Sequence, residues 1–382
     1  MKRTSVLLLV AGTSIAALLS ASSAFAAQNV ANPSQKGSLL IWPAINVNPS
    51  LAEDTLIEIS NDGIVTVQVQ CEYVNERKGR VSFDFPLTAK ETASWSVGTR
   101  AGDEVQPPPF PTYIGSPTFD DGQGAGQQVR GELICFATDA GGANQVAFNE
   151  LTGTGTPIKR DNTSSTQPKE GYKYNAWAFI ARASGGSPAA DDPVTPFGTA
   201  GDLVLDGGSE GGTYDACPLY NIVNFMPNGA TLGSAPNTFT TFTNNLVVVS
   251  CNQDLRQDYN LWLTKLVFLQ WNSHESSYDG SWFCADSLDN VPLTATKDPT
   301  NFNFGVLKTP NARFTVQGEA STQCPGSVAT GLLGVFYSDV GINNTTTPTN
   351  EIGSNTSGAG AETGFVWWNP TGGAPPPAAK PK

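Results

Sequence analysis

Histidine is almost missing from this chain of 382 residues, because His274 is the only one. A Ser-His-Asp triad, a histidine-based metal site and a histidine general base would all have to use this one side chain. It stands in a polar segment, residues 271–276, that directly follows an apolar run. We therefore expect a solvated loop histidine, and we expect no enzyme, no cofactor and no metal centre built around it.

Positive charge is also scarce. The chain has 21 lysine and arginine residues against 34 aspartate and glutamate residues, which gives a formal net charge of −13. Loss of Lys2 and Arg3 with the leader described below would take the net charge to −15. Nucleic-acid binding needs lysine and arginine to neutralise phosphates, so no nucleic-acid partner is expected. Charged residues make up only 14% of the chain, a composition that favours strands joined by polar turns.

The C-x-x-C spacing is absent, which argues against thioredoxin chemistry, c-type haem and iron–sulfur ligation. Six cysteines are nonetheless present, and an even number in an exported protein favours disulfides. Six cysteines allow 15 connectivities. The simplest of these pairs neighbours along the chain: Cys71–Cys135, Cys217–Cys251 and Cys284–Cys324.

Long apolar runs are confined to the start of the chain. Lys2 and Arg3 precede an apolar stretch over residues 6–19, and Ala24-Phe25-Ala26 then gives the small–x–small pattern that signal peptidase accepts. This pattern predicts a signal peptide over residues 1–26. A membrane span needs about 20 apolar residues, and no later segment reaches that length. We expect an exported protein without an integral membrane segment, located in the periplasm, on the cell surface or outside the cell.

Alternation of apolar and polar residues is the clearest pattern in the rest of the chain. Residues 65–73, 81–87 and 129–137 carry apolar side chains at every second position, as half-buried antiparallel strands do. Asn61-Asp62-Gly63 precedes the first of these strands and predicts a tight hairpin turn, hence a meander. Cys71 and Cys135 fall on the apolar faces of their strands, which predicts a disulfide that staples two sheets together.

Similar strands are expected later in the chain. Residues 261–271 are apolar on both faces, as in a strand that is buried on both sides or lies at an interface. Residues 217–226 predict a short helix, with Pro218 near its first turn. Together these patterns predict an all-β fold of antiparallel β-sandwich architecture, as one large sandwich or two in tandem, stapled by disulfides.

The expected organisation continues from the signal peptide in five parts. They are a flexible N-terminal segment (27–37), a first sandwich region (38–182), a Gly- and Asp-rich connection with the short helix (183–245), a second sandwich region (246–370) and a proline-rich disordered tail (371–382).

One nucleophile-elbow pattern occurs, at Gly207-Gly208-Ser209-Glu210-Gly211. The alternating β–α pattern that this motif requires is missing around it, so we expect a glycine-rich surface turn. Gly153-Thr154-Gly155 lacks the third glycine of a phosphate-binding loop, and Pro157 follows it. Neither pattern predicts a catalytic or phosphate site.

A cluster of acidic residues lies in the glycine-rich part of the connection. Calcium prefers such oxygen ligands, and a solvated acidic loop explains the cluster equally well. The cluster consists of Asp191, Asp192, Asp202, Asp206 and Glu210.

Tryptophan is the remaining indicator of a binding site, with eight residues in the chain. Exposed tryptophan rings in sugar-binding sandwiches stack on pyranose faces, whereas core packing is expected for most tryptophans. Trp367 and Trp368 are adjacent, and neighbours on a strand point to opposite faces, so a strand here would leave one ring exposed. We predict a ligand site or interface at this pair.

The stretch from Gly37 to Leu87 and the segment Cys324-Pro325-Gly326-Ser327-Val328-Ala329 resemble a family of exported bacterial β-rich proteins with no assigned activity. The resemblance covers most of the chain after the leader. It implies an exported β protein and brings no site residues.

These observations predict a non-enzymatic structural, adhesive or assembly protein, whose partners are itself, other surface proteins or glycans. In a fimbrial version, Ser38 to Val47 would fill a groove in the next subunit. The alternative is a carbohydrate-binding or carbohydrate-active sandwich. Its marks would be two or three coplanar exposed aromatic rings, or a pair of carboxylates in a cleft.

Overall fold

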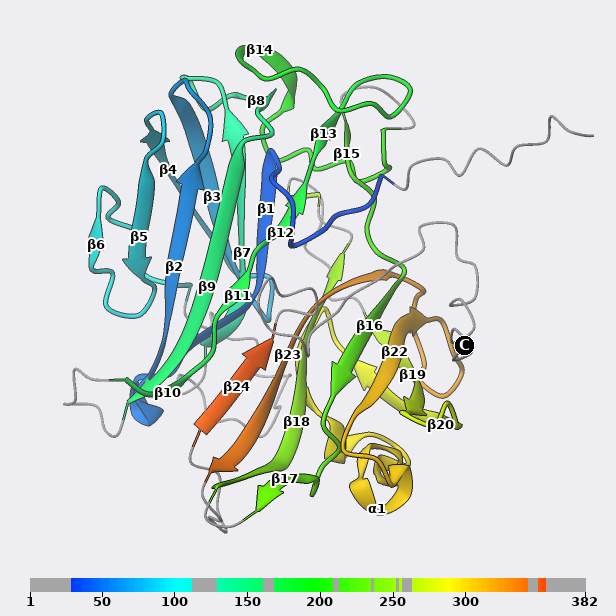
Figure 1. Cartoon of the computed structure of the whole chain (residues 1–382). Helices are drawn as coiled ribbons and strands as arrows, with labels where there is room; N and C mark the ends of the chain where they lie inside the picture. Colours follow the sequence, from blue (N-terminus) through cyan, green and yellow to red (C-terminus); the bar gives the residue numbers. More distant parts are fainter. Residues whose placement is uncertain are drawn as a thin grey trace, which may run out of the picture.

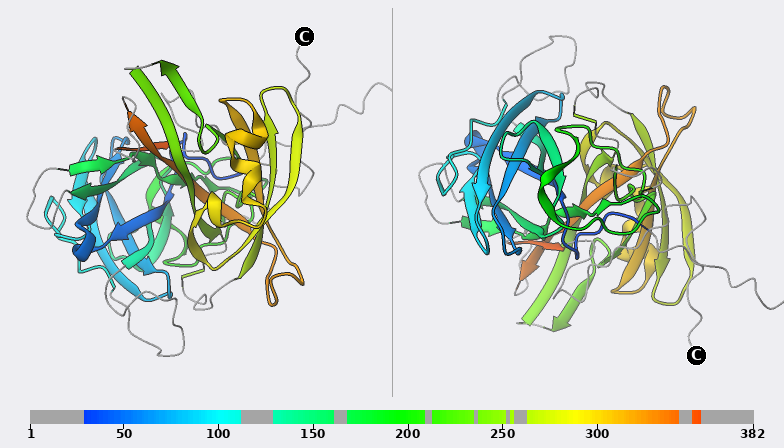
Figure 2. Two further views of the ribbon diagram at one scale, coloured as in Figure 1. Left: turned by 90° about the horizontal axis from the view of Figure 1, so that it is seen from below. Right: turned by 90° about the horizontal axis from the view of Figure 1, so that it is seen from above.

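The structure is a computed structural model that describes residues 29–111, 129–160, 168–208, 213–234, 237–251, 254–255, 263–342 and 350–354. The predicted signal peptide therefore lies outside the described residues, as do Ser209, Glu210, Trp262, Trp367 and Trp368. The described residues form antiparallel sheets that pack in two lobes (Figure 1), which confirms the predicted all-β fold. Two further views show the lobes side by side (Figure 2).

Lobe 1 consists of two facing sheets. Sheet I contains β12 (Trp177–Phe179), β1 (Leu39–Val47), β7 (Val129–Thr138), β3 (Val67–Asn75) and β4 (Arg80–Leu87) in that order, extended by β8 (Asn144–Ala147) and β14 (Asp192–Thr199). Sheet II contains β10 (Pro168–Gly171), β9 (Leu151–Arg160), β2 (Glu53–Asn61), β5 (Thr92–Ser96) and β6 (Gly102–Asp103), with β11 (Tyr174–Asn175) beside β9.

The core of lobe 1 lies between these sheets and follows the predicted alternation. Ile57 and Ile59 of β2 are fully buried against the inner side chains of sheet I. The indole nitrogen of Trp95 on β5 donates a hydrogen bond of 2.7 Å to the hydroxyl of Tyr73 on β3. The two sheets are therefore joined by a polar contact inside an apolar core.

The part of sheet I around β1 is buried on both faces. Leu40 of β1 packs into the core between the sheets, whereas Leu39 and Ile41 point the other way and are equally buried. Their cover comes from the N-terminal segment and from the connection, which contains the short ribbon of β13 (Ala181–Arg182) and β15 (Thr213–Tyr214). A strand with two buried faces needs an unbroken apolar sequence, and Leu-Leu-Ile-Trp at 39–42 supplies it.

The predicted hairpin at Asn61-Asp62-Gly63 is wrong, because β2 lies in sheet II and β3 in sheet I. Asn61 shapes the crossing loop instead. Its buried amide donates to the carbonyl oxygens of Val65, Leu87 and Thr88, and its Oδ1 accepts from the amide of Gly63 at 2.7 Å. A buried Asn can thus direct the chain from one sheet to the other.

Of the 15 possible connectivities, the structure has the simplest, in which all six cysteines pair with their neighbours along the chain. Cys71 and Cys135 do face the core, but they are register partners on adjacent strands of sheet I. The expectation that their disulfide staples two sheets is therefore wrong. Neighbouring core-facing positions in one sheet satisfy the same alternation pattern as positions in two sheets.

Lobe 2 also consists of two facing sheets. Sheet III contains β16 (Tyr220–Phe225), β22 (Ala312–Glu319), β19 (Thr264–Asn272) and β20 (Ser277–Ala285). Sheet IV contains β17 (Thr231–Ser234), β18 (Asn237–Cys251), β23 (Gly331–Ile342) and β24 (Asn350–Ser354), with β21 (Leu288–Pro292) beside β18. The short helical turns are η1 (Pro49–Leu51), η2 (Leu293–Ala295), η3 (Pro299–Phe302) and α1 (Phe304–Leu307).

Residues 217–226 do not form the predicted short helix, because Tyr220–Phe225 is strand β16 and pairs with β22. Val223 and Phe225 are buried at alternating positions in the core of lobe 2, and Ile222 and Val223 are β-branched residues that favour strands. Lobe 2 therefore begins within the segment predicted to be a connection.

Strand β19 is not buried on both sides. Leu266 and Phe268 are fully buried in the core of lobe 2, whereas Val267, Leu269 and Trp271 remain partly exposed on the outer face of sheet III. The described part of the predicted 261–271 strand is thus half-buried, with an apolar outer face.

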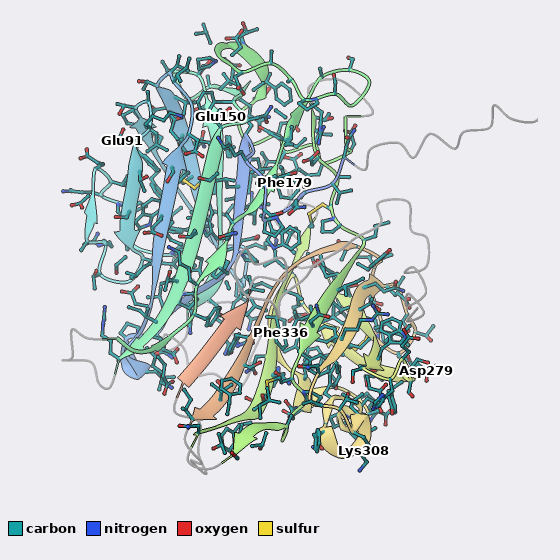
Figure 3. All side chains as sticks on the ribbon, in the orientation of Figure 1. Glu91, Glu150, Phe179, Asp279, Lys308 and Phe336 are labelled. Carbon is teal, nitrogen blue, oxygen red and sulfur yellow. A yellow bond between two sulfur atoms is a disulfide. The ribbon has the colours of Figure 1, made fainter. Side chains whose placement is uncertain are left out.

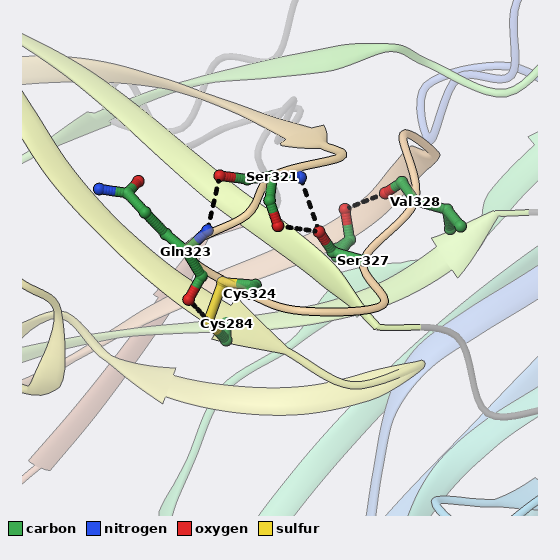
Figure 4. Close-up of a disulfide and its surroundings, with 7 residues drawn as sticks. Cys284, Ser321, Gln323, Cys324, Ser327 and Val328 are labelled. Carbon is green, nitrogen blue, oxygen red and sulfur yellow. Dashed lines mark hydrogen bonds between the residues drawn. A yellow bond between two sulfur atoms is a disulfide. The ribbon is translucent and has the colours of Figure 1, made fainter.

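The Cys284–Cys324 disulfide ties the edge strand β20 to the loop after β22 (Figure 4). The loop is closed by its own serines: the amide of Ser321 donates to Oγ of Ser327 at 2.8 Å, and that hydroxyl donates back to the carbonyl of Ser321 at 3.1 Å. The disulfide therefore anchors a loop that already has internal hydrogen bonds. Cys217–Cys251 similarly ties the end of the connection to the end of β18.

The segment predicted to be flexible, residues 27–37, is ordered from Asn29 onward. Its Asn29 amide donates to the carbonyls of Gly186 and Gly207, Ala31 donates to Ala216 at 3.0 Å, and Val30 and Ala31 are buried. Backbone pairing and apolar burial together fix this segment against the connection.

The lobes share apolar core. Val247 and Val335 of sheet IV belong to the buried cluster of lobe 1, and the rings of Tyr172 and Tyr337 stack with centroids 4.8 Å apart. The indole of Trp177 donates to the carbonyl of Gly334 at 3.2 Å. Within the described residues, none of the helical segments has the length and apolar character of a membrane span.

Candidate functional site

The residues examined as catalytic or metal-binding candidates are not brought together in the described part of the chain. His274 is exposed in the β19–β20 turn, as predicted, and its amide donates to Asn272 at 3.0 Å. Ser209 lies outside the described residues. Among the described side chains, no group of three or more histidines, cysteines or carboxylates is placed to hold a metal.

Three acidic residues of the connection accept hydrogen bonds from backbone amides. Asp192 accepts from the amides of Val194 and Thr195, both at 3.0 Å, and Asp206 accepts from the amide of Gly208 at 2.9 Å. Asp191 accepts from the amide of Asn149 at 2.6 Å. These carboxylates satisfy backbone donors separately, so the solvated-loop alternative accounts for them.

The tryptophans divide into two groups. Trp42, Trp95 and Trp177 are buried core residues, whereas Trp271 and Trp282 are partly exposed on the outer face of sheet III. Trp367 and Trp368, the predicted ligand or interface pair, lie outside the described residues together with Trp262.

A groove of about 510 Å³ lies on the outer face of sheet II. Its floor is formed by strands β5, β2 and β9, and its walls by β11 and the N-terminal segment. Seven of the twelve lining residues are polar and uncharged, and two are charged: Pro33, Ser34, Gln35, Lys36, Glu58, Ser60, Thr92, Thr152, Gly153, Thr154, Asn175 and Ala176.

The sequence of β9 explains why its outer face carries hydroxyls. Thr152, Thr154 and Thr156 alternate with Gly153 and Gly155. Within residues 152–156, the threonines therefore occupy the outward positions and the glycines the inward ones. The glycines face inward, where a Cβ on Gly153 would come within 2.2 Å of Trp42 and one on Gly155 within 2.6 Å of Tyr174. The bulky aromatic rings of the core thus require glycine on one face of the strand.

Strand register extends the hydroxyls from β9 into rows across sheet II. Adjacent strands lie about 4.8 Å apart, and residues on the same face recur about every 7 Å along a strand. One row across the floor contains Thr92, Ser60 and Thr152, and the next contains Ser94, Glu58 and Thr154. The hydroxyls of Ser60 and Thr92 are 2.8 Å apart and bond to each other.

The third row lies beyond the groove. Leu56 is exposed there, and the hydroxyl of Ser96 is buried and donates to Asp54. Thr156 therefore stands on the same face of β9 as Thr152 and Thr154 without lining the groove.

The N-terminal segment is held in place as the groove wall by buried partners. The amide of Gln35 donates to the carboxylate of Asp215 and to the carbonyl of Ala178, both at 2.9 Å. Asp215 is fully buried and is paired with the guanidinium of Arg182 at 2.6 Å. The wall is therefore anchored in the same polar network that holds the connection.

Ion pairs neutralise the charges at the groove. Lys36 lies 2.7 Å from Glu150 and 3.2 Å from Asp62, and Glu150 marks this end of lobe 1 in Figure 3. Glu58 accepts hydrogen bonds from Lys173 and Thr154, and these bonds lower the pKa of its carboxyl below the ordinary value. The lining thus offers hydroxyl and amide groups with balanced charges.

This lining is suited to binding a polyhydroxylated molecule through hydrogen bonds. Serine and threonine hydroxyls both donate and accept, and the amides of Gln35 and Asn175 add to the polar lining. Proton transfer is poorly supported, because Glu58 is the one carboxylate among the described lining residues. Its lowered pKa is the reverse of what a general acid needs.

Sequence reasoning overlooked this groove. Gly153-Thr154-Gly155 was considered only as an incomplete phosphate loop, whereas the informative pattern is the period-two alternation Thr-Gly-Thr-Gly-Thr at 152–156. A strand with threonine on one face and glycine on the other predicts a hydroxyl surface backed by large core residues. The rows across β5 and β2 depend on register, which alternation does not reveal.

Two other cavities flank this region of lobe 1. One of about 630 Å³ adjoins the groove through Lys36 and is lined by the exposed Ile64. The other, of about 190 Å³, lies between the lobes beside Tyr172 and Tyr337.

Comparisons with protein families, with curated proteins and with solved structures gave no match.

Proposed function

We propose that this chain is an exported, non-enzymatic adhesive protein that binds neutral glycans in the groove of sheet II. The observation that carries the proposal is the array of hydroxyl side chains on β5, β2 and β9. Its ligand is a sugar chain whose hydroxyls exchange hydrogen bonds with these rows.

The size and polarity of the groove support this ligand class. A volume of about 510 Å³ is within the range of pockets that hold small organic ligands. Hydroxyl groups at regular spacing match a ligand that repeats hydroxyls along its length. Charges would favour an ionic ligand, but those of Lys36 and Glu58 are already paired within the protein.

Export is part of the proposal. The leader-like residues 1–26 predict it, and three disulfides fit an oxidising compartment, where such bonds persist. An acidic surface also fits a protein that stays soluble outside the cell.

An adhesive role is favoured over a role in which subunits assemble by donating a strand to one another. Of residues 38–47, considered above as a donor, Leu39–Val47 form β1, which lies between β12 and β7 in sheet I. Its apolar side chains are buried on both faces. Donation to another subunit would remove a central strand from the protein's own core. The free-energy cost of this step is far larger than that of donating a terminal segment that is unpaired in its own subunit.

The test is binding to a panel of neutral polysaccharides, with dextran, mannan, galactan, xylan and cellulose as probes. The double variant Thr92→Val/Thr152→Val removes two groove hydroxyls and keeps the β-branched shape that favours strands. Loss of two hydrogen bonds should weaken binding about tenfold.

Thr156→Val is the matched control, because it makes the same chemical change on the same face of β9 outside the groove. Its affinity should equal that of the unmodified protein. Equal losses in both variants, or no binding to any member of the panel, would reject the groove as a glycan site.

A further inference from the structure

The outer face of sheet III carries two tryptophans, each with a cation over its ring. Nζ of Lys265 lies 5.5 Å from the ring centroid of Trp282, and the guanidinium carbon of Arg313 lies 5.0 Å from the ring centroid of Trp271. Both rings are partly exposed. The face therefore presents the same combination, an indole and a positive charge, at two places.

Register defines how these two units are arranged. Trp282 on β20 pairs with Val267 on β19, and Trp271 lies four residues farther along β19, opposite Arg313 on β22. Four residues of strand span about 13–14 Å. Val267 and Leu269 lie between the units and are partly exposed. A ligand that contacts both rings is therefore an extended chain and not a single sugar.

The charge of this face contrasts with that of the protein. The chain as a whole has a net charge of −13. The described cations between residues 213 and 354 are Lys265, Lys297, Lys308 and Arg313, and two of these four lie on this face. The carboxylate on the same face, Glu319, accepts a hydrogen bond from Gln317. Each ring of this face thus has a cation beside it, and Glu319 is the register partner of Lys265.

From this arrangement we propose that the outer face of sheet III binds an acidic linear polysaccharide. Each indole stacks on the C–H face of one pyranose ring, and the neighbouring cation pairs with a carboxylate of the sugar chain. This site lies in the other lobe from the groove, and it differs in chemistry because its ligand is anionic. Lobe 1 therefore binds neutral glycans and lobe 2 acidic ones.

The experiment measures binding of the full-length oxidised protein to polygalacturonate and alginate. Poly-glutamate is the comparison, because it is an anionic chain without pyranose rings. We expect binding to the two uronate polymers that weakens as salt is raised, because surface charges are screened. Binding to poly-glutamate should be at least tenfold weaker.

Two variants test the two parts of the recognition unit. Lys265→Gln/Arg313→Gln removes the charges, and Trp271→Leu/Trp282→Leu removes the rings while keeping apolar side chains. Each should weaken uronate binding about tenfold or more. Lys308→Gln is the control, because Lys308 is an exposed cation of the same lobe that caps α1 (Figure 3) and belongs to none of the strands β19, β20 and β22.

Several results would overturn the proposal. The first is that the unmodified protein does not bind uronate polymers. The second is that it binds poly-glutamate equally strongly and that the tryptophan changes have no effect. The third is that the Lys308→Gln control loses as much uronate binding as the other variants. Poly-glutamate binding of that kind would assign the face to acidic peptides instead. The glycan groove is judged separately by the neutral panel and the threonine variants, so each proposal fails or stands alone.

Discussion

At the scale of single residues, Gly153 connects the core to the groove. A Cβ at this position would lie 2.2 Å from Trp42 and 3.0 Å from the carbonyl oxygen of Glu58. Trp42 is fully buried and has no room to retreat. The glycine therefore lets β9 lie flat on the core while Thr152 and Thr154 face the groove.

We predict that Gly153→Ala lowers the free energy of unfolding by about 1–3 kcal/mol, as overpacking of a close-packed core does. Urea denaturation monitored by tryptophan fluorescence measures this change. In the control variant Gly141→Ala, the new Cβ would have only a carboxylate oxygen of Asp139 near it, at 3.7 Å. The urea concentration at the midpoint of unfolding of this variant should therefore stay unchanged. Equal midpoints for both variants would contradict the packing of Trp42 against β9.

Single residues also show what the sequence pattern leaves out. The alternation around Cys71 and Cys135 correctly indicated that both face the core. It did not distinguish a partner in the same sheet from one in the facing sheet. Asn61 is the reverse case: its tight-turn sequence is typical of hairpins, but three hydrogen bonds from its buried amide direct the chain to the other sheet. Two of those acceptors, on Leu87 and Thr88, are distant in sequence and are invisible to local analysis.

At the scale of elements, burial on one or both faces separates the strands. Strand β1 is buried on both faces, whereas β19 is buried on one. The apolar sequence of 261–271 left two alternatives for β19, burial on both sides or an interface, and the half-buried outer face excludes the first. The composition of a strand does not decide between these two.

A series of Leu→Ala substitutions tests this difference with one residue type. Leu39→Ala and Leu40→Ala on opposite faces of β1, and Leu266→Ala on the inner face of β19, should each cost about 2–5 kcal/mol. Leu269→Ala on the outer face of β19 should cost less than half as much, because this side chain is already partly exposed. Equilibrium unfolding in urea gives the four values. A small cost for Leu39→Ala would contradict the second buried face of β1.

The elements that were predicted correctly have clean alternation and strong β residues, as in β3, β4 and β7. Strand β16 was mistaken for a helix because Pro218 suggested a helical first turn and the segment is short. Pairing with β22 decides its structure, and a pairing between residues about 90 positions apart cannot be read from either segment alone. The N-terminal segment was mistaken for a flexible one for the same reason, because its partners Ala178 and Ala216 are distant in sequence.

At the scale of the whole molecule, the two lobes meet through apolar contacts and through charged groups. Asp289 on β21 is half-buried, and burial together with the neighbouring Asp286 raises the pKa of its carboxyl to about 6. Arg130 of lobe 1 acts in the opposite direction. The ionised form of Asp289 is therefore less stable in the folded protein than in water.

The sign of the pH dependence follows from this shift. Between the ordinary value of 3.8 and about 6, the folded state holds a proton that the unfolded state has lost, so stability falls as pH rises. We predict that Asp289→Asn raises the free energy of unfolding at pH 7.5 by on the order of 1–3 kcal/mol. The gain should be small near pH 3.5, where Asp289 is mostly protonated in both states.

Urea unfolding of both proteins across this pH range measures the difference. Carboxyls with lowered pKa values, such as Glu58, give the opposite slope, but they are common to both proteins and cancel in the comparison. A variant that is less stable than the parent at pH 7.5 would show that the attraction to Arg130 outweighs the cost of burial.

The central claim is that the hydroxyl rows on sheet II are a glycan-binding surface. A crystal structure of the protein with the neutral oligosaccharide that binds most tightly tests it most directly. We expect the sugar in the groove, with its hydroxyls within hydrogen-bonding distance of Thr92, Thr152 and Asn175. A sugar bound over Trp271 and Trp282, with the groove holding only water, would contradict the claim.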